Sequence, residues 1–207
     1  MASTLFPMFL KLAGRPCLVV GAGEMGESKI LGLLETGARI RVVALEASPA
    51  VRSWARDGKI DLELRAFSPS GLDGVFLVVA ATASRPLNER IFDEAKKRNV
   101  LCNVVDVPDL CDFFYPAVVR RGDLQIAIST AGQSPSLAQK IRQQLEQQFG
   151  PGYAAWVAEL GATRKLILAS DLDRERKLDL LHSLASRKAV EAALAEIPAL
   201  AASGGTK

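Results

Sequence analysis

The amino-acid sequence predicts an α/β fold, in which a doubly wound parallel sheet precedes a small β-hairpin and helix region and a C-terminal helical domain. Three observations carry this prediction. A Gly-x-Gly-x-x-Gly motif at residues 21–26 directly follows a short apolar run, strand and helix patterns alternate through the first half, and the alternation stops after Asp106. We therefore expect domains at residues 1–113, 114–149 and 150–207, the middle one serving dimerisation.

Five short apolar runs predict the strands, and several are continuous, as in parallel strands that are covered on both faces. They span residues 17–20, 39–45, 61–66, 75–80 and 100–105. Helical patterns separate them at residues 25–36 before Gly37, at residues 50–57, and at residues 87–98 after Pro86. The segment 68–74 is too short for a full helix. This order predicts right-handed crossovers between parallel strands.

The second half begins with a hairpin pattern, residues 116–120 and 124–130 around a turn at residues 121–123 that contains Gly122. Ser134 can cap a helix that has Pro135 at its first position and ends near Phe149. Residues 153–197 are helical in character, with breaks expected near Ser170 and Ser186, and the tail 198–207 is expected to fray.

The C-terminal helical end carries more apolar side chains than about fifty residues can bury by themselves. The set comprises Trp156, Leu160, Leu166, Ile167, Leu168, Leu178, Leu180, Leu181 and Leu184. These side chains need a surface on the first domain or on a second copy of the chain. We predict a homodimer built through this region.

The composition is that of a globular protein, with 49% hydrophobic residues and no apolar run near the ~20 residues of a membrane span. Met1–Pro7 lacks the basic and apolar pattern of a signal peptide. A net charge of +3 is too low to favour nucleic acid. Three cysteines without metal spacing fit a reducing cytoplasm. We expect neither a membrane nor a nucleic-acid partner, and no resident metal.

The glycine motif follows a strand pattern and opens a helix, which is the order that a dinucleotide-binding Rossmann unit requires. Gly21 suits the tight turn, Gly23 allows the backbone to approach a pyrophosphate, and Gly26 allows close helix–strand packing. Free N–H groups in the first helical turn would face the phosphates. Glu46 ends the second strand about twenty positions after Gly26. Its carboxylate would accept from a ribose 2′-hydroxyl and repel a 2′-phosphate, which favours NAD over NADP.

Ligands of doubly wound sheets collect at the carboxyl ends of the strands, where Thr82, Asn88, Asn103 and Asp106 follow the fourth and fifth strands. Asp106 leaves an apolar strand, and partial desolvation there would make its carboxylate a better proton acceptor. From position alone, a carboxylate that caps the loop before Pro108 is the alternative.

Several stretches together resemble the dehydrogenase/chelatase module of siroheme synthase and the stand-alone precorrin-2 dehydrogenases. They are residues 17–23, residues 80–82 with Asn88, residues 102–106, residues 114–117 and residues 126–135. The resemblance is close over residues 5–150 and general in the helical tail. It implies NAD-linked oxidation of precorrin-2 to sirohydrochlorin in siroheme biosynthesis. Some members also insert Fe²⁺, and the motifs leave open whether this chain does.

The resemblance also implies roles for individual residues. Asp106 matches an aspartate needed for both reactions and would take a proton from the macrocycle. The expected cofactor contacts are Gly21, Ala22, Gly23, Glu24, Met25, Gly26, Glu46, Thr82, Asn88 and Asn103. A substrate with many carboxylates needs cations and helix N-termini. The candidates are Arg120, Arg121, Thr130, Ser134, Lys140 and Arg142, although Arg120 and Arg121 flank a turn, where a solvated tip is the default explanation for such charge.

One departure from the family pattern concerns a phosphorylatable serine of siroheme synthases. Thr130 stands at that position and Ala131 replaces a common glycine, although Ser129 is adjacent. Regulation by phosphorylation at this position is therefore in doubt. Siroheme synthase also carries a methyltransferase domain that this sequence lacks.

Two other functions compete with this interpretation. An NAD-sensing regulatory domain shares the glycine motif and the acidic end of the second strand, but it usually continues into a second α/β module and needs no carboxylate at Asp106. A hydroxy-acid dehydrogenase usually needs a histidine or lysine as acid or base. His182, the only histidine, lies far down the helical end and suits a surface or interface position.

Overall fold

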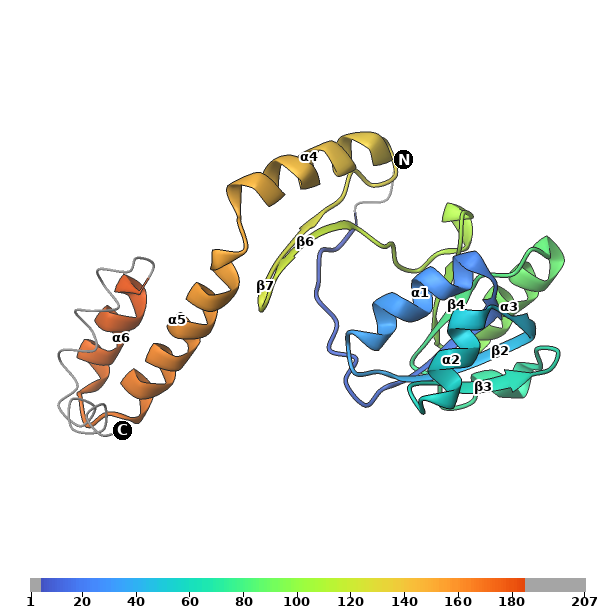
Figure 1. Cartoon of the computed structure of the whole chain (residues 1–207), viewed down its shortest axis with the longest axis horizontal. Coiled ribbons are helices and arrows are strands. Elements are labelled where there is room, and N and C mark those ends of the chain that lie inside the picture. Colours follow the sequence, from blue (N-terminus) through green and yellow to red (C-terminus); the bar gives the residue numbers. More distant parts are fainter. Residues whose placement is uncertain (1–4, 185–207) are drawn as a thin grey trace. The chain divides into compact units, whose positions relative to one another are not determined.

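The computed structural model of the chain describes residues 5–184 (Figure 1). The chain divides into two compact units, Met1–Tyr115 and Pro116–Lys207. The predicted break near Ser186 and the predicted fraying of residues 198–207 lie outside the described residues. Within residues 5–184, no helix combines the length and apolar character needed to cross a bilayer.

The first unit is built on a five-stranded parallel sheet with the strand order β3-β2-β1-β4-β5. The strands are β1 (Pro16–Ala22), β2 (Arg39–Ala47), β3 (Asp61–Leu64), β4 (Leu77–Ala80) and β5 (Leu101–Val104). All five predicted strands are confirmed, and their ends differ from the prediction by about two residues or fewer. The order reverses between β1 and β4, so the carboxyl ends of these two strands form the switch point where ligands bind.

Helices cover both faces of this sheet, as a doubly wound fold requires (Figure 1). The helical elements are α1 (Glu24–Leu34), α2 (Pro49–Arg56) and α3 (Arg85–Lys97), with short 3₁₀ turns η1 (Pro69–Leu72) and η2 (Pro108–Leu110). Ile30 of α1 and Val51 of α2 pack with Val19 in one buried cluster. Ile91 of α3 and Leu72 of η1 belong to the opposite cluster. The segment 68–74 holds only a 3₁₀ turn, as its length predicts.

Two of the helices of the first unit, α2 and α3, begin at serine caps. The Ser48 hydroxyl accepts from the backbone N–H of Val51 at the start of α2, and the Ser84 hydroxyl accepts from Leu87 at the start of α3. Each serine is followed by proline within the first turn, where a missing N–H costs nothing. Local sequence therefore determines where the chain leaves the sheet edge and turns back.

The second unit contains an antiparallel hairpin followed by helices. Its elements are β6 (Ala117–Arg121), β7 (Leu124–Ile128), α4 (Pro135–Gln148), α5 (Gly152–Ala169) and α6 (Arg174–Ser183). Arg121 pairs with Leu124, so the turn has two residues rather than the three expected. The predicted helix break at Ser170 is confirmed. Ile167, Leu180 and Leu184 form the buried cluster of α5 and α6.

The tryptophans contribute to packing, as their positions on amphipathic helices predict. Trp54 of α2 packs partly buried against the first cluster of the sheet. Trp156 of α5 is half-buried, and its ring centroid lies 5.4 Å from that of Tyr153 in an edge-to-face arrangement.

Candidate functional site

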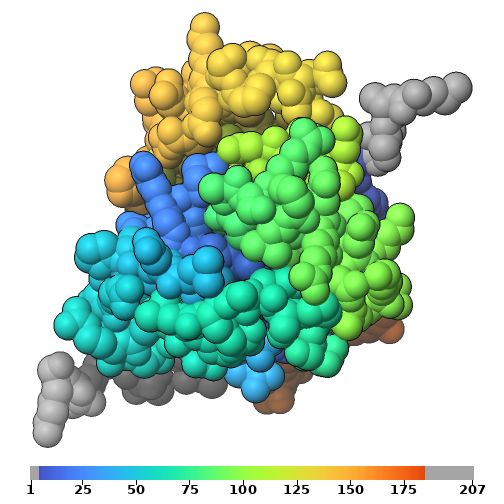
Figure 2. Space-filling view, turned by 90° about the vertical axis from the view of Figure 1, so that its right-hand side faces the viewer, coloured from blue at the N-terminus to red at the C-terminus, as the bar shows by residue number. Residues whose placement is uncertain are grey.

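A cavity of about 710 Å³ lies at the carboxyl ends of the parallel strands. Its lining includes residues 20–25, 43–46, 65–67, 81–84, Leu87, Arg90, Val105 and Asp106. In Figure 2 the segments that border it meet on one face of the first unit, as blue atoms of the α1 region bordered by cyan, teal and green atoms. The volume lies in the range of small-molecule and cofactor sites.

The glycine motif lines one wall of this cavity, and each glycine meets a different constraint. Gly21 has φ +103°, and a Cβ there would overlap the carbonyl oxygen of Ala81. A Cβ on Gly26 would overlap the carbonyl oxygen of Gly21, because α1 packs directly on β1. Gly23 caps α1 and has no atom within 4 Å of a hypothetical Cβ. Open space beside the first turn of a helix is what a pyrophosphate needs. The cavity therefore fits a dinucleotide.

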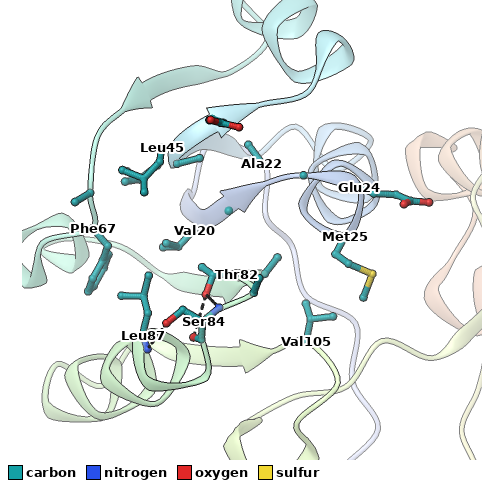
Figure 3. A pocket seen from close by; sticks show the side chains of 18 of the residues that line it. Val20, Ala22, Glu24, Met25, Leu45, Phe67, Thr82, Ser84, Leu87 and Val105 are labelled. Atoms are coloured by element: carbon teal, nitrogen blue, oxygen red, sulfur yellow. Dashed lines mark hydrogen bonds between the residues drawn. The ribbon is translucent and has the colours of Figure 1, made fainter.

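Each end of the cavity combines apolar side chains with a carboxylate. Figure 3 shows Leu45, Phe67 and Leu87 on one side, and Met25 and Val105 on the other. Glu46 follows Leu45 at the end of β2, whereas Asp106 follows Val105 just after β5. Because β1 and β4 separate β2 from β5, the two carboxylates lie at opposite ends of the cavity.

Asp106 adopts a left-handed backbone conformation with φ +62°. A non-glycine residue in this region is uncommon, and such conformations cluster at functional sites. The N–H of Val107 donates to the carbonyl of Val104 at 3.2 Å and closes the turn around Asp106. The side chain is exposed, which corrects the expectation of partial desolvation by the protein. Any desolvation of this carboxylate must come from the bound ligands.

Thr82 lines the cavity, and Asn88 holds it in place. The Thr82 hydroxyl donates to Oδ1 of Asn88 at 2.6 Å, and Nδ2 of Asn88 donates to the carbonyl of Thr82 at 3.0 Å. Asn88 is 6% exposed and is absent from the lining. Asn88 therefore supports the loop that carries Thr82, and its contact with the cofactor stays a prediction.

Asn103 has a similar structural role on β5. Its Nδ2 donates to the carbonyl of Phe113 at 2.8 Å, and the residue is 6% exposed. The Asp112 carboxylate accepts from the backbone N–H of Cys102 at 2.9 Å beside it. Asn103 thus fastens the segment after η2 to the sheet and does not line the cavity, contrary to the expectation.

The cysteines near the sheet lack the character of nucleophiles. Burial raises the pKa of Cys17 to about 11 and that of Cys102 to about 12. Burial also raises the pKa of the Cys111 thiol, which donates to the carbonyls of Val104 and Val107. Residues 5–184 contain no group of three histidine, cysteine or acidic side chains arranged to hold a metal ion.

The substrate-binding candidates all lie in the second unit. Ser134 caps α4 by accepting from Leu137 at 3.2 Å, and its N–H donates to the Thr130 hydroxyl at 3.1 Å. Arg120 and Lys140 are exposed. The arrangement leaves the α4 N-terminus with a hydroxyl-rich loop, in which Ala131 and Gly132 have positive φ.

Two arginines among these candidates are engaged within the unit. Arg121 donates to the carbonyl of Phe149 at 2.8 Å and to that of Glu146 at 3.2 Å, so it caps the C-terminal end of α4. This corrects the expectation of a solvated tip for Arg121. Arg142 forms an i,i+4 ion pair with Glu146. His182 is exposed in the last turn of α6.

The lining residues that sequence reasoning missed include two cations, Arg65 and Arg90, and the aromatic side chain of Phe67. Arg65 and Phe67 follow β3 directly, as the predicted ligands follow the other strands. That position at the carboxyl end of a strand was the available signal.

Comparisons with known proteins agree with this geometry. A family model described as putative NAD(P)-binding matches residues 8–117, and the model of the sirohaem biosynthesis protein central region matches residues 121–148. The solved structure of SirC, a precorrin-2 dehydrogenase, is similar with a TM-score of 0.81 and 30% identity, covering 93% of this chain and 98% of that chain.

Curated relatives point the same way. Siroheme synthase 1 of Serratia proteamaculans is 45% identical over 140 residues, which cover 68% of this chain and 29% of that protein. Siroheme synthase of Citrobacter koseri is 38% identical over 174 residues, covering 82% and 38% respectively. The chain therefore spans about a third of the length of the curated relatives that it matches.

Proposed function

Because this chain belongs to the family of precorrin-2 dehydrogenases and siroheme synthase dehydrogenase modules, we propose that it oxidises precorrin-2 to sirohydrochlorin in siroheme biosynthesis. The observation that carries the proposal is one cavity that joins the glycine motif to the Asp106 carboxylate. The tetrapyrrole substrate and the nicotinamide cofactor rest on the family to which the chain belongs.

Residues at the two ends of the cavity would have different roles, one end binding the cofactor and the other accepting a proton. NAD⁺, when bound, supplies the hydride acceptor. The α1 N-terminus and the open space at Gly23 hold the pyrophosphate, and Glu46 accepts from the ribose hydroxyls at the far end. The oxidation removes one hydride and one proton from the macrocycle. Asp106, at the opposite end, accepts that proton as an ionised carboxylate.

NAD rather than NADP is the proposed cofactor, because Glu46 is the acidic side chain at the end of β2 and lines the cavity. A carboxylate there repels a 2′-phosphate and hydrogen-bonds a 2′-hydroxyl. Replacing Glu46 with alanine should weaken NAD⁺ binding and reduce discrimination against NADP⁺. An unchanged cofactor preference would remove this role of Glu46.

The proposal includes a homodimer formed through the second unit. Leu137 of α4, Leu168 of α5 and Leu178 of α6 each expose 46–50% of their surface. Apolar side chains of this size favour a partner surface. Sedimentation that gives a monomer at micromolar concentration would refute the dimer. We also place the protein in the cytoplasm, because Cys17, Cys102 and Cys111 are free.

The competing NAD-sensor interpretation has no support in the structure. A sensor would continue into a second α/β ligand module, whereas β6, β7 and three helices follow here within the described residues. A hydroxy-acid dehydrogenase is equally unsupported, because the cavity lining contains no histidine or lysine.

The central experiment supplies purified protein with precorrin-2 and NAD⁺ and follows NADH by absorbance. Asp106→Asn keeps a side chain that tolerates positive φ but cannot accept the proton. We expect it to lower kcat by a factor of about 10²–10⁴ while NAD⁺ still binds. Asp109→Asn is the matched control, because Asp109 is exposed nearby and does not line the cavity. Unchanged turnover in Asp106→Asn would reject Asp106 as the proton acceptor.

Fe²⁺ insertion is a separate reaction and needs its own assay. If it occurs, the tetrapyrrole nitrogens supply the metal ligands and Asp106 is the group placed to take the pyrrole protons. Sirohydrochlorin with Fe²⁺ or Co²⁺ tests the reaction, and loss of metallation in Asp106→Asn would assign both steps to one carboxylate.

A further inference from the structure

We propose that Arg65 can bind the 2′-phosphate of NADP but is kept from doing so by its ion pair with Glu63. The choice between NAD and NADP therefore depends on Glu63 as well as on Glu46. This inference rests on the proposed use of a nicotinamide cofactor in the cavity. It assigns a role in cofactor specificity to Glu63, which lies in β3, and to Arg65, which directly follows β3.

The position of Arg65 places it beside the expected ribose site. β2 and β3 are neighbouring parallel strands, and Ala44 pairs with Leu64. Arg65 follows Leu64 directly, and Glu46 lies two residues beyond Ala44. Both side chains line the same cavity. An arginine close to the acidic residue of a Rossmann site is the usual means of binding a 2′-phosphate.

The guanidinium of Arg65 is not free to bind a phosphate in this structure, because it forms an ion pair with Glu63. Nε of Arg65 donates to Oε2 of Glu63 at 2.6 Å, and Nη2 lies 2.5 Å from the same oxygen. Nη1 donates to the carbonyl of Ala66 at 3.0 Å. Each of the three guanidinium nitrogens thus has a partner. The Glu63 carboxylate neutralises the charge of Arg65 in the absence of a cofactor.

A second arginine keeps the Glu63 carboxylate in this position. Nε of Arg41 lies 3.8 Å from Oε1 of Glu63, and Nη2 of Arg41 donates to the carbonyl of Gly71. Glu63 therefore lies between two cations, whose contacts fix its carboxylate beside Arg65. The side chains of Arg41, Glu63 and Arg65 are 30–39% exposed, so releasing Arg65 should cost little stability.

The arrangement makes a specific prediction about two carboxylates. Removing Glu46 alone removes repulsion but leaves Arg65 engaged with Glu63. Removing Glu63 alone frees Arg65 but leaves the Glu46 carboxylate beside it. Only the double change presents a free guanidinium without an opposing charge, so the gain in NADP⁺ affinity should exceed the product of the single effects.

Arg90 provides the matched control. It lies on α3, lines the same cavity and is exposed, so it is a second cation that a phosphate might reach. If general positive charge in the cavity determined NADP⁺ binding, Arg90 and Arg65 would matter equally. The proposal requires that Arg65 alone accounts for the gain.

The experiment titrates NAD⁺ and NADP⁺ separately by calorimetry into the wild-type chain, Glu46→Gln, Glu63→Gln and the double variant. We expect the double variant to bind NADP⁺ about tenfold more tightly than the product of the single effects predicts. Adding Arg65→Met should remove the gain, whereas adding Arg90→Met should leave it. NAD⁺ affinity in Glu63→Gln should stay within about threefold of wild type, which shows that the cavity is intact.

A double variant that shows only multiplicative single effects overturns the proposal, as does a gain that Arg90→Met removes. These results are independent of the proposed dehydrogenation. Failure to oxidise precorrin-2 with normal NAD⁺ binding would refute that function and leave the role of Glu63 standing. A wild-type chain that binds NADP⁺ as tightly as NAD⁺ would overturn this inference and the proposed preference for NAD, but not the proposed dehydrogenation.

Discussion

The two units of the chain differ in how completely they bury their own apolar side chains. In the first unit, two buried clusters cover both faces of the parallel sheet. In the second unit, α4 buries only Ala138, and Leu137 remains 49% exposed. The first unit can therefore shape a cofactor site by itself, whereas the second has apolar surface suited to a partner.

The difference extends to the groups that would bind ligands. In the first unit, the backbone at the ends of strands and the start of α1 makes the site, and Gly21 and Gly26 are constrained by carbonyl oxygens. In the second unit, the polar side chains near α4 mainly cap helix ends, as Ser134 and Arg121 do. Disturbing the two units should therefore give different readouts.

The largest effect is expected for Gly21→Ala in the first unit. A Cβ at φ +103° that overlaps the Ala81 carbonyl should destabilise the unit by about 3 kcal/mol and abolish NAD⁺ binding. Gly23→Ala should leave the melting temperature nearly unchanged and weaken only the cofactor, because no atom lies within 4 Å of the new Cβ. Thermal unfolding with NAD⁺ titration separates the two. Equal melting of both variants would contradict the distinct roles.

Alkaline pH should weaken the first unit through its buried thiols. The folded-state pKa is about 11 for Cys17 and about 12 for Cys102, both raised by burial above the ordinary thiol value of 9.0. Between pH 9 and the folded-state pKa, the thiol has lost its proton in the unfolded chain but keeps it in the folded chain. The free energy of unfolding is therefore unaffected below pH 9 and falls as the pH rises above it. At pH 10 each thiol accounts for about 1 kcal/mol of the loss.

Denaturant unfolding at pH 8 and pH 10 measures this loss. The double variant Cys17→Ala/Cys102→Ala is expected to be less stable at pH 8 but to change less between the two pH values. An identical pH dependence in both proteins would show that other groups control it.

Arg121→Met tests the independence of the second unit. Removing the guanidinium leaves the carbonyls of Phe149 and Glu146 without this donor at the end of α4, at an expected cost of about 1–2 kcal/mol. NAD⁺ affinity should stay at the wild-type value, because the cavity lies in the first unit. Circular dichroism on heating and NAD⁺ titration measure the two quantities. A large loss of NAD⁺ affinity would show that the cofactor cavity of the first unit depends on the second unit.

Ser134→Ala should give the smallest effect. The Ser134 hydroxyl accepts from the N–H of Leu137, and loss of such a cap costs about 1 kcal/mol. Ser134→Asp retains an acceptor at the cap and should restore the stability. If Ser134 also contacts substrate carboxylates, Ser134→Asp would raise the KM for precorrin-2 while leaving thermal stability intact. An unchanged KM would limit Ser134 to capping.

Most of the first unit was predictable because its signals are local. The glycine motif, the apolar strands and the serine caps act over a few residues, through backbone conformation and through helix ends that need acceptors. Asp106 was predictable because parallel strands bring their carboxyl ends to one edge. The η2 turn and the exact ends of strands were not, because packing decides them.

Residue roles that depend on distant segments were not predictable. Asn88 and Asn103 looked like cofactor ligands, but their amides are used by Thr82 and by Phe113. Arg121 looked like an exposed tip, but the hairpin brings it to the end of α4, 28 residues further along the chain.

The sequence by itself determined the strand–turn–helix that opens the first unit, the caps of its helices, and the carboxylates at both ends of its cavity. Tertiary structure decided which polar side chains remain free to meet a ligand. A polar group in a folded chain pairs with whatever donor or acceptor the strand register and helix packing bring near it. The partners of Arg121 lie 25 and 28 residues away in sequence and those of Asn88 and Asn103 lie 6 and 10 residues away, and only the folded chain shows which groups meet.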